Sequence, residues 1–171
     1  MMVERFTRAL SDDLRAELRQ QTLTVRQAVT LASIVEKETG RAEERNLVAS
    51  VYRNRLKIGM GLQCDPTVIY ALARAGRYNG NLTREDLAFD SPYNTYKYAG
   101  LPPGPIASPG RASLEAAVRP AATGYLFFVS RNDGTHVFAQ NLDEHNRNVR
   151  DYQIQYFREK HLKESAGGPR P

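Results

Sequence analysis

Two glutamates near the end of a predicted helix are the residues of this sequence best suited to acid–base chemistry. Glu36 and Glu38 lie within the stretch Leu31–Thr39. Helical spacing places Lys37 on the wet side and the glutamates on the two flanks of an apolar stripe. A carboxyl at such a border can be partly desolvated, which raises its pKa toward the value that a general acid needs. The alternative is two ordinary solvated glutamates, which composition alone favours. Periodicity does not indicate which of the two glutamates would be functional.

The helix that carries both glutamates is predicted to run from Val25 to Gly40. Thr24 and Gln27 have the spacing of a capping box at its start. Gly40 is expected to end it in the left-handed conformation. The side chains of its apolar stripe, which should face the core, are Val25, Ala28, Val29, Leu31, Ala32 and Val35.

Gln63 and Asp65 lie in a loop that leads into a short predicted helix, Thr67 to Arg74. Asp65 precedes Pro66, an arrangement typical of a helix N-terminus. The sequence therefore supports a capping role for Asp65 at least as well as a catalytic role. Gln63 has no local capping role. Its amide both donates and accepts hydrogen bonds, which suits an acetamido group or a sugar hydroxyl.

Aromatic and polar side chains alternate in the stretch 91–96. The rings of Tyr93 and Tyr96 could pack on the apolar face of a pyranose, while the amide of Asn94 bonds its hydroxyls. The alternative is that the two tyrosines belong to a strand and face the core. For each tyrosine, the sequence favours neither interpretation over the other.

The stretch 101–110 holds four of the nine prolines. No helix or central strand tolerates that density, so this segment is predicted to be a rigid loop. Ser108 within it is a plausible substrate contact. A nucleophilic role for Ser108 is not expected, because no histidine at a recognisable spacing accompanies it.

The other predicted elements are mostly helices. A packing helix is expected over residues 1–21 and a third helix over 42–58, which Gly59 should end. Buried positions of the third helix are expected at Leu47, Val48, Val51, Leu56 and Ile58. A short helix over 111–118 is followed by a hairpin, whose strands are Tyr125–Ser130 and Thr135–Ala139, and by a final helix near 143–160. The predicted fold class is α+β, mainly helical with a small antiparallel hairpin.

Composition sets limits on the function. The chain has 171 residues with 41% hydrophobic content, enough for one globular domain with a core. A net charge of +5 fits an anionic partner such as nucleic acid, a membrane surface or a cell-wall polymer, without choosing among them. No apolar stretch approaches the length of a membrane span, and no secretory signal is visible. Cys64 is the single cysteine and the three histidines are scattered, so neither a disulfide nor a metal site is expected.

The order of several motifs resembles a known enzyme family. They are LASIVEKET, ERNLVASVYRNRLKIGMGLQCDPTVIYAL, SPYNTY, GLPPGPIASPG, AAVRPA, YLFFVS and HVFAQNLDEHNRNV. Together they cover Leu23 to Tyr152 and resemble the catalytic domain of the MltG (YceG-like) endolytic murein transglycosylases. In that family the second glutamate of the EKE run is the catalytic acid, which corresponds to Glu38. Glu36 occupies a position that is expected to vary more.

The resemblance implies cleavage inside peptidoglycan strands, between N-acetylmuramic acid and N-acetylglucosamine, with 1,6-anhydro ends as products and no cofactor. Glu38 would act as acid and then as base. The residues expected to contact the glycan are Gln63, Asp65, Tyr93, Asn94, Tyr96 and Ser108. One alternative is a hydrolase that activates water with Glu38 and either Asp65 or Glu36. Another is a non-catalytic basic module that binds wall glycan or nucleic acid.

Members of this family carry a membrane anchor and a LysM-like domain before the catalytic part. The chain is therefore expected to be an excised catalytic fragment or a shortened form, with residues 1–22 as a packing helix, 23–160 as the catalytic domain and 161–171 as a disordered tail. The resemblance implies a parent protein at the periplasmic face of the inner membrane. Its expected partners are peptidoglycan strands and proteins of cell-wall synthesis, and no nucleic acid.

Overall fold

The computed structural model describes residues 10–21, 23–158 and 161–162. The chain forms two compact units, Met1–Thr123 and Gly124–Pro171. The described part of the first unit consists of helices and loops, and the second contains a two-stranded antiparallel sheet beside a helix. This architecture confirms the predicted α+β class with mainly helical content. Within the described residues, no helix combines the length and the apolar character needed to cross a membrane.

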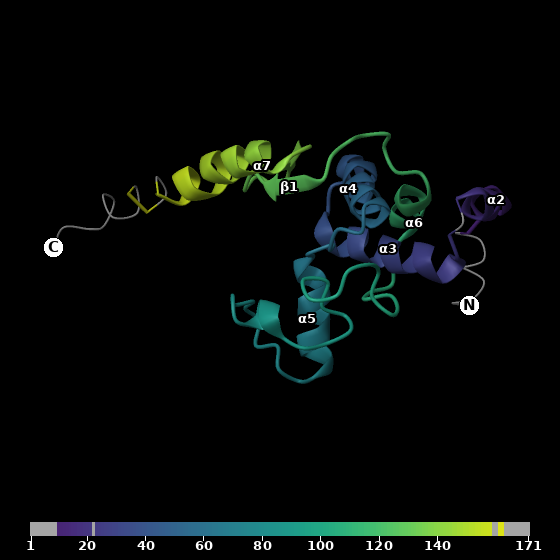
Figure 1. The fold of residues 1–171 in the computed structure, drawn as a ribbon, viewed down its shortest axis with the longest axis horizontal. Helices are drawn as coiled ribbons and strands as arrows, with labels where there is room; N and C mark the ends of the chain where they lie inside the picture. Colours follow the sequence, from purple (N-terminus) through teal and green to yellow (C-terminus); the bar gives the residue numbers. More distant parts are fainter. Residues whose placement is uncertain (1–9, 22, 159–160, 163–171) are drawn as a thin grey trace. The chain divides into compact units, whose positions relative to one another are not determined.

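Helix α3 (Val25–Glu38) is the central element of the first unit. It packs against α6 (Arg111–Val118), α4 (Arg45–Lys57) and α5 (Asp65–Arg74) (Figure 1). The predicted capping box is present, because the Thr24 side chain accepts from the Gln27 backbone and the Gln27 side chain accepts from the Thr24 backbone. The buried residues of α3 are Ala28, Thr30, Leu31, Ala32, Ser33, Ile34 and Val35.

The end of α3 differs from the expectation. The helix stops at Glu38, and Thr39 has the extended backbone angles φ −135° and ψ 133°. Gly40 is not among the residues with positive φ, so its predicted left-handed role is wrong. The Thr39 hydroxyl accepts a hydrogen bond from the Arg41 backbone N–H at 3.1 Å. This bond fixes the turn and makes a left-handed glycine unnecessary there.

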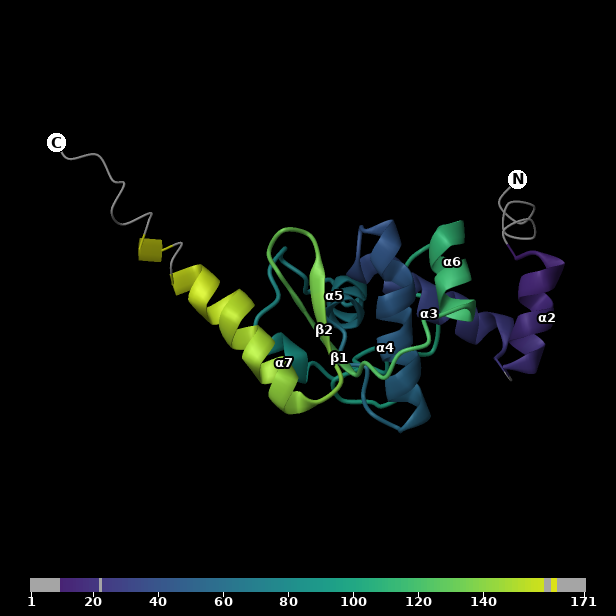
Figure 2. The ribbon, with the colours of Figure 1, turned by 90° about the horizontal axis from the view of Figure 1, so that it is seen from above.

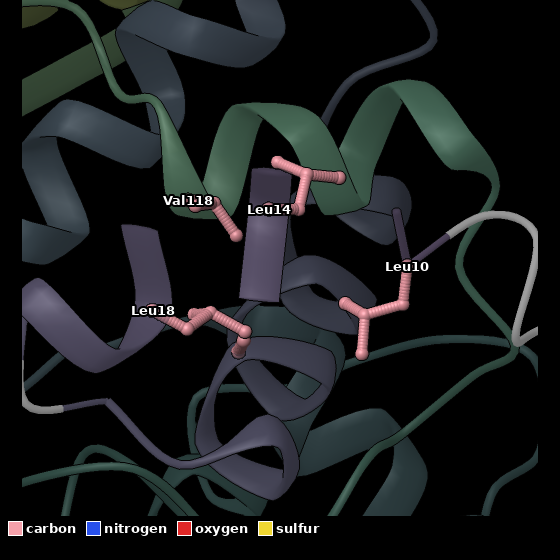
Figure 3. Close-up of a cluster of buried hydrophobic side chains, with 5 residues drawn as sticks. Leu10, Leu14, Leu18 and Val118 are labelled. Atoms are coloured by element: carbon pink, nitrogen blue, oxygen red, sulfur yellow. The ribbon is translucent and has the colours of Figure 1, made fainter. Parts of the chain in front are cut away.

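Helix α2 (Asp12–Gln20) is the described part of the predicted N-terminal helix, whose residues 1–9 lie outside the described residues. Ser11 caps it by accepting from the Leu14 N–H at 3.4 Å. Figure 3 shows the apolar cluster that attaches it to the rest of the unit. Its members are Leu10, Leu14, Leu18, Ala28 and Val118. Over these residues the helix packs against Ala28 of α3 and Val118 of α6.

Helix α4 follows a single 3-10 turn, η1 (Ala42–Glu44). Gly59, with φ 70°, ends it as predicted, and the Met60 N–H bonds to the Arg55 carbonyl at 2.9 Å. Ile58 was expected to be buried, but it lies at the helix end and is 62% exposed. Tyr52 and Arg55 occupy the buried face instead.

The proline-rich segment 101–110 has neither helix nor strand, as predicted, and polar side chains of α3 hold it in place. Arg26 donates to the Pro103 carbonyl from Nε at 3.0 Å and from Nη2 at 2.7 Å. Ser33, which is fully buried, accepts from the Ile106 backbone N–H at 3.0 Å. The path of the loop is therefore set by α3.

Glu36 supplies the N-terminal cap of α6 from another helix. Its Oε2 accepts from the Gly110 backbone N–H at 3.1 Å and from Ser113 Oγ at 2.6 Å. Arg45 lies 3.8 Å from its Oε1. The Ser113 hydroxyl is the main reason that the pKa of Glu36 falls below its ordinary value, with Gly110 and Arg45 adding to the effect. Glu36 is thus a fixed carboxylate at the positive end of α6.

The second unit contains the predicted hairpin. Strand β1 (Phe127–Ser130) pairs antiparallel with β2 (His136–Ala139). Asn132 and Gly134 have positive φ in the turn between them. Helix α7 (Leu142–Val149) is capped by Asn141, lies beside both strands (Figure 2) and continues into the π-helical segment η3 (Arg150–Gln155). The first strand begins two residues later than Tyr125, where the sequence placed it.

Replacing Glu36 by Gln should destabilise the first unit, because it removes a charged acceptor from Gly110 and Ser113. Hydrogen bonds to charged groups typically contribute about 1.5–3 kcal/mol to the free energy of unfolding, and a loss of about that size is expected. The pKa of Glu36 is lowered from 4.5 in the folded state. Its stabilising effect is therefore complete above about pH 4.5 and is lost as the pH falls through the lowered value.

Chemical denaturation of parent and variant across acid and neutral pH measures both effects. Glu43→Gln is the matched control, because Glu43 is 69% exposed and lies 3.8 Å from the half-exposed Arg41. It should change stability little. Equal stability of parent and Glu36→Gln at neutral pH, or an equal loss of stability on acidification, would contradict the capping role.

Candidate active site

Three separate segments meet around the carboxyl of Glu38. Glu38 is the last residue of α3 and is half-buried. Cys64, in the loop before α5, donates from Sγ to Glu38 Oε2 at 3.2 Å. Tyr52 of α4 is 1% exposed, and its hydroxyl hydrogen-bonds to Cys64 and Glu38. Neither contact was predicted from the sequence. The helical period of 3.6 residues could have placed Tyr52 on the same buried face as Val48, but not beside Glu38.

Both donors are neutral at ordinary pH. Burial raises the pKa of the Cys64 thiol well above its usual value, and the negative charge of Glu38 adds to the effect. Burial likewise raises the pKa of Tyr52, and so do its interactions with Cys64 and Glu38. The thiol and the phenol therefore keep their protons and can donate them in hydrogen bonds to the carboxylate.

Arg55 brings a positive charge to the same region. It is 7% exposed, and its Nη1 donates to the Leu62 carbonyl at 2.6 Å. Burial lowers the pKa of Arg55, while its neighbours Tyr52, Tyr96, Cys64 and Glu38 act in the opposite direction. Arg55 thus holds the loop before α5 and contributes an electrostatic attraction to Glu38.

Thr95 ties that loop to the segment 91–98. Its carbonyl accepts from the Gln63 N–H at 3.1 Å, and its Oγ1 accepts from the Cys64 N–H at 3.0 Å. Thr67 Oγ1 lies 2.9 Å from Thr95 Oγ1. Thr95 is only 2% exposed, so it serves the architecture rather than a ligand. Gln63 has the positive φ of 49°, and its side chain is exposed beside Cys64.

Asp65 and Tyr96 form a pair next to this cluster. The predicted capping role of Asp65 is wrong, because Cys64 is the N-cap residue of α5, no side chain caps the helix, and Asp65 is its first residue. The Tyr96 hydroxyl instead donates to Asp65 Oδ1 at 2.6 Å. Burial and Asp65 raise the pKa of Tyr96, and the charge of Glu38 acts in the same direction. Asp65, Tyr96 and Glu38 therefore share one electrostatic neighbourhood.

Asn94 has a different position from the one expected of a sugar contact. It is fully buried, and its Nδ2 donates to the carbonyls of Leu87 at 3.0 Å and Phe89 at 2.7 Å. Its Oδ1 accepts from the Tyr96 N–H at 2.9 Å. The side chain thus organises its own loop and presents no surface to a ligand in this structure.

Tyr93 and Ser108 lie on other parts of the first unit. The ring of Tyr93 packs on Tyr70, with centroids 4.9 Å apart, and Arg74 lies 5.4 Å from its centre. A Cβ at Gly104 would lie 3.4 Å from the Tyr93 hydroxyl, so this tyrosine joins α5 to the proline-rich loop. Ser108 is exposed on that loop, and its role as a substrate contact stays a prediction.

The site contains one half-buried carboxyl faced by neutral donors and a nearby cation, an arrangement suited to moving a proton. Metal ions have no evident place in it. Among the residues that the structure describes, no group of three or more His, Cys, Asp or Glu side chains is placed to hold one.

Comparison with known proteins places the chain in a family. The model of the YceG-like family matches residues 1–151. The chain is 42% identical to an endolytic murein transglycosylase of Bacillus subtilis over 146 residues, which are 85% of this chain and 40% of that protein. It is 37% identical to an endolytic murein transglycosylase of Streptococcus pneumoniae strain D39 over 139 residues, which are 79% of this chain and 25% of that protein.

A solved structure agrees with these matches. The crystal structure of a YceG-like protein of Listeria monocytogenes superposes with a TM-score of 0.71 and 45% identity, covering 80% of this chain and 43% of that one. The chain thus spans less than half the length of each of these relatives. Sequence, family model and fold agree, and the chain belongs to the YceG-like family.

Proposed function

We propose that this chain is the catalytic part of an endolytic murein transglycosylase that cleaves glycan strands of peptidoglycan between N-acetylmuramic acid and N-acetylglucosamine. The relatives with 42% and 37% identity carry that activity in their names. The single observation that carries the assignment of Glu38 is the different setting of the two glutamates. Glu36 is fixed as a carboxylate at α6, whereas Glu38 is half-buried beside Cys64 and Tyr52.

The proposed reaction uses one carboxyl twice. Protonated Glu38 gives its proton to the glycosidic oxygen as the bond from that oxygen to muramoyl C1 breaks. The resulting carboxylate then takes the proton of the muramoyl C6 hydroxyl, whose oxygen closes on C1 to form a 1,6-anhydro ring. No water is consumed, and Glu38 ends in the protonated form in which it began.

A hydrolase is the alternative closest in chemistry, and it needs a second group to activate water. Glu36 is engaged by Gly110, Ser113 and Arg45, which disfavours it for that task. Asp65 accepts from the Tyr96 hydroxyl through Oδ1, which engages one of its two carboxylate oxygens. An intramolecular attack by the C6 hydroxyl has a high effective concentration and needs no second carboxylate, which favours the transglycosylase.

The substrate contacts proposed on this basis are the exposed side chains around Glu38. Gln63 offers an amide for acetamido and hydroxyl groups, and Tyr96, which is 36% exposed and held by Asp65, offers a ring face to a sugar. Ser108 is a further candidate on the proline-rich loop. We further propose, from the family resemblance, that the full-length protein acts on the cell wall at the periplasmic face of the inner membrane, beside proteins of wall synthesis.

Glu38→Gln keeps the volume and polarity of the side chain but removes the transferable proton. Turnover of purified glycan strands should fall by about 10²–10⁴-fold, with little change in the unfolding transition. Glu36→Gln is the control on the same helix. After correction for its folded fraction it should keep most of its activity, and a reversal of these two results would exchange the roles of the glutamates. A non-catalytic binding module would bind glycan equally well with and without the Glu38 carboxyl.

Gln63→Ala should affect glycan turnover and not stability, whereas Asn94→Ala should affect stability. Gln63 is exposed, so its replacement should raise KM or lower turnover with the melting temperature nearly unchanged. Asn94 makes three buried hydrogen bonds, so its replacement should cost about 2 kcal/mol or more in the free energy of unfolding. Thermal unfolding measured beside glycan turnover separates the two. A stable Asn94→Ala protein with poor turnover would indicate that Asn94 contacts the substrate.

Digestion in heavy-oxygen water distinguishes the transglycosylase from the hydrolase. The nucleophile of the proposed reaction is the sugar's own C6 hydroxyl, so new muramoyl ends should carry no label and should be lighter by one water than hydrolytic ends. Mass spectrometry of early digests measures both. Label in the new muramoyl ends would favour the hydrolase. Mid-length fragments early in the digest are expected from cleavage inside the strands.

A further inference from the structure

Cys64 and Tyr52 reach Glu38 from positions that are fixed independently of it. The backbone of Cys64 is held on both sides, because its N–H donates to Thr95 Oγ1 at 3.0 Å and its carbonyl accepts from Thr67 Oγ1 at 2.7 Å. Tyr52 is 1% exposed in the core face of α4. The loop before α5 therefore fixes the position of the Cys64 donor, and α4 fixes the position of the Tyr52 donor. The carboxyl of Glu38, at the end of α3, lies beside both.

We propose that Cys64 and Tyr52 are positioning residues for Glu38, whose hydrogen bonds fix the orientation of its carboxyl and favour its charged form. The inference rests on the proposed function, in which Glu38 is the general acid. The distance from Cys64 Sγ to Glu38 Oε2 is 3.2 Å, and Tyr52 interacts with both partners. The two side chains thus act through Glu38 and are not assigned a contact with substrate.

The direction of the effect follows from the protonation of the donors. Burial raises the pKa of both Cys64 and Tyr52, so each donates a hydrogen rather than presenting a negative charge to Glu38. Hydrogen bonds to a carboxylate favour its charged form. Removing either donor should therefore make Glu38 hold its proton to a higher pH. A loosened carboxyl is also a poorer acid, because proton transfer needs a heavy-atom distance of about 2.6–3.2 Å.

Other charged or titratable groups that face Glu38 come from α4 and from the segment 91–98. Arg55 of α4 attracts the carboxylate, and Tyr96 interacts with it electrostatically while its hydroxyl donates to Asp65. Neither Arg55 nor Tyr96 is substituted in the Cys64 and Tyr52 variants. A shift in the titration of Glu38 therefore reports the altered donor.

Four variants test the inference: Cys64→Ala, Cys64→Ser, Tyr52→Phe and the control Ser50→Ala. The first and third remove a donor, whereas Cys64→Ser restores one as a hydroxyl. Ser50 is a buried polar residue of α4 whose hydroxyl bonds to the Leu47 carbonyl and to Thr123 Oγ1, both at 2.7 Å, and not to Glu38. Its replacement measures the general effect of losing a buried hydroxyl from this helix.

Two readouts are used on each protein. Carbon-13 NMR follows the Glu38 carboxyl through a pH titration without substrate, with the signal assigned by its absence in Glu38→Gln. The pH dependence of kcat/KM on glycan strands follows the same group in the reaction. Cys64→Ala and Tyr52→Phe should raise the Glu38 midpoint by about half to one pH unit and move the alkaline limb of the rate profile upward by the same amount. Cys64→Ser should lie close to the parent, and Ser50→Ala should not shift.

The outcomes separate this inference from the proposed function. An unshifted midpoint in Cys64→Ala and Tyr52→Phe would overturn the positioning role, and so would a Cys64→Ser protein as strongly shifted as Cys64→Ala. If Tyr52→Phe fails to fold, the two Cys64 variants decide alone. A parent protein that makes no 1,6-anhydro ends would refute the proposed function, while the NMR titration would still measure the link between the donors and Glu38.

Discussion

The burial of helix α3 against its neighbouring helices is the constraint on which the first unit depends. Helix α3 packs against α4, α5 and α6, so each polar side chain on it must find a partner or reach the surface. Arg26, Ser33 and Glu36 find theirs in the proline-rich loop and at the start of α6. Through these bonds, one face of α3 fixes the path of the proline-rich loop, which has neither helix nor strand.

Two glutamates that are two residues apart acquire different chemistry from this packing. Side chains two positions apart on a helix point about 200° from one another, so they face different neighbours. Glu36 meets the N-terminus of α6, where its lowered pKa keeps it a carboxylate at neutral pH, and it joins two helices. Glu38 meets a thiol and a phenol that burial keeps neutral, with the charge of Arg55 nearby. The first glutamate is committed to structure, and the second is placed where a proton could be exchanged.

The loops around Glu38 are ordered by buried polar residues rather than by apolar packing alone. Thr95 joins the segment before α5 to the segment 91–98, and Asn94 closes the latter upon itself. Such bonds are costly to leave unmade inside a protein, so they specify one loop conformation. The exposed side chains of Gln63 and Tyr96 belong to these two segments.

Local sequence patterns account for several features of this protein. The capping box at Thr24, the end of α4 at Gly59, the proline-rich loop and the hairpin with its turn at Asn132 all follow from rules that act within a few residues. Its ordered motifs also indicated the family, which the family model confirms. Periodicity left open which glutamate has a special setting, because both lie at the border of the same stripe.

Contacts between distant segments give the two glutamates different surroundings and fix the positions of the polar loop residues. The sequence predicts Asn94 as a sugar contact, but its side chain is buried within its own loop. The sequence predicts Asp65 as a helix cap, but its carboxylate accepts a hydrogen bond from Tyr96, 31 residues away. Cys64 and Tyr52 become partners of Glu38 through contacts between separate segments, the first of them across 26 residues. A side chain's hydrogen-bond partner depends on which distant segment burial brings beside it, and no local pattern encodes that choice.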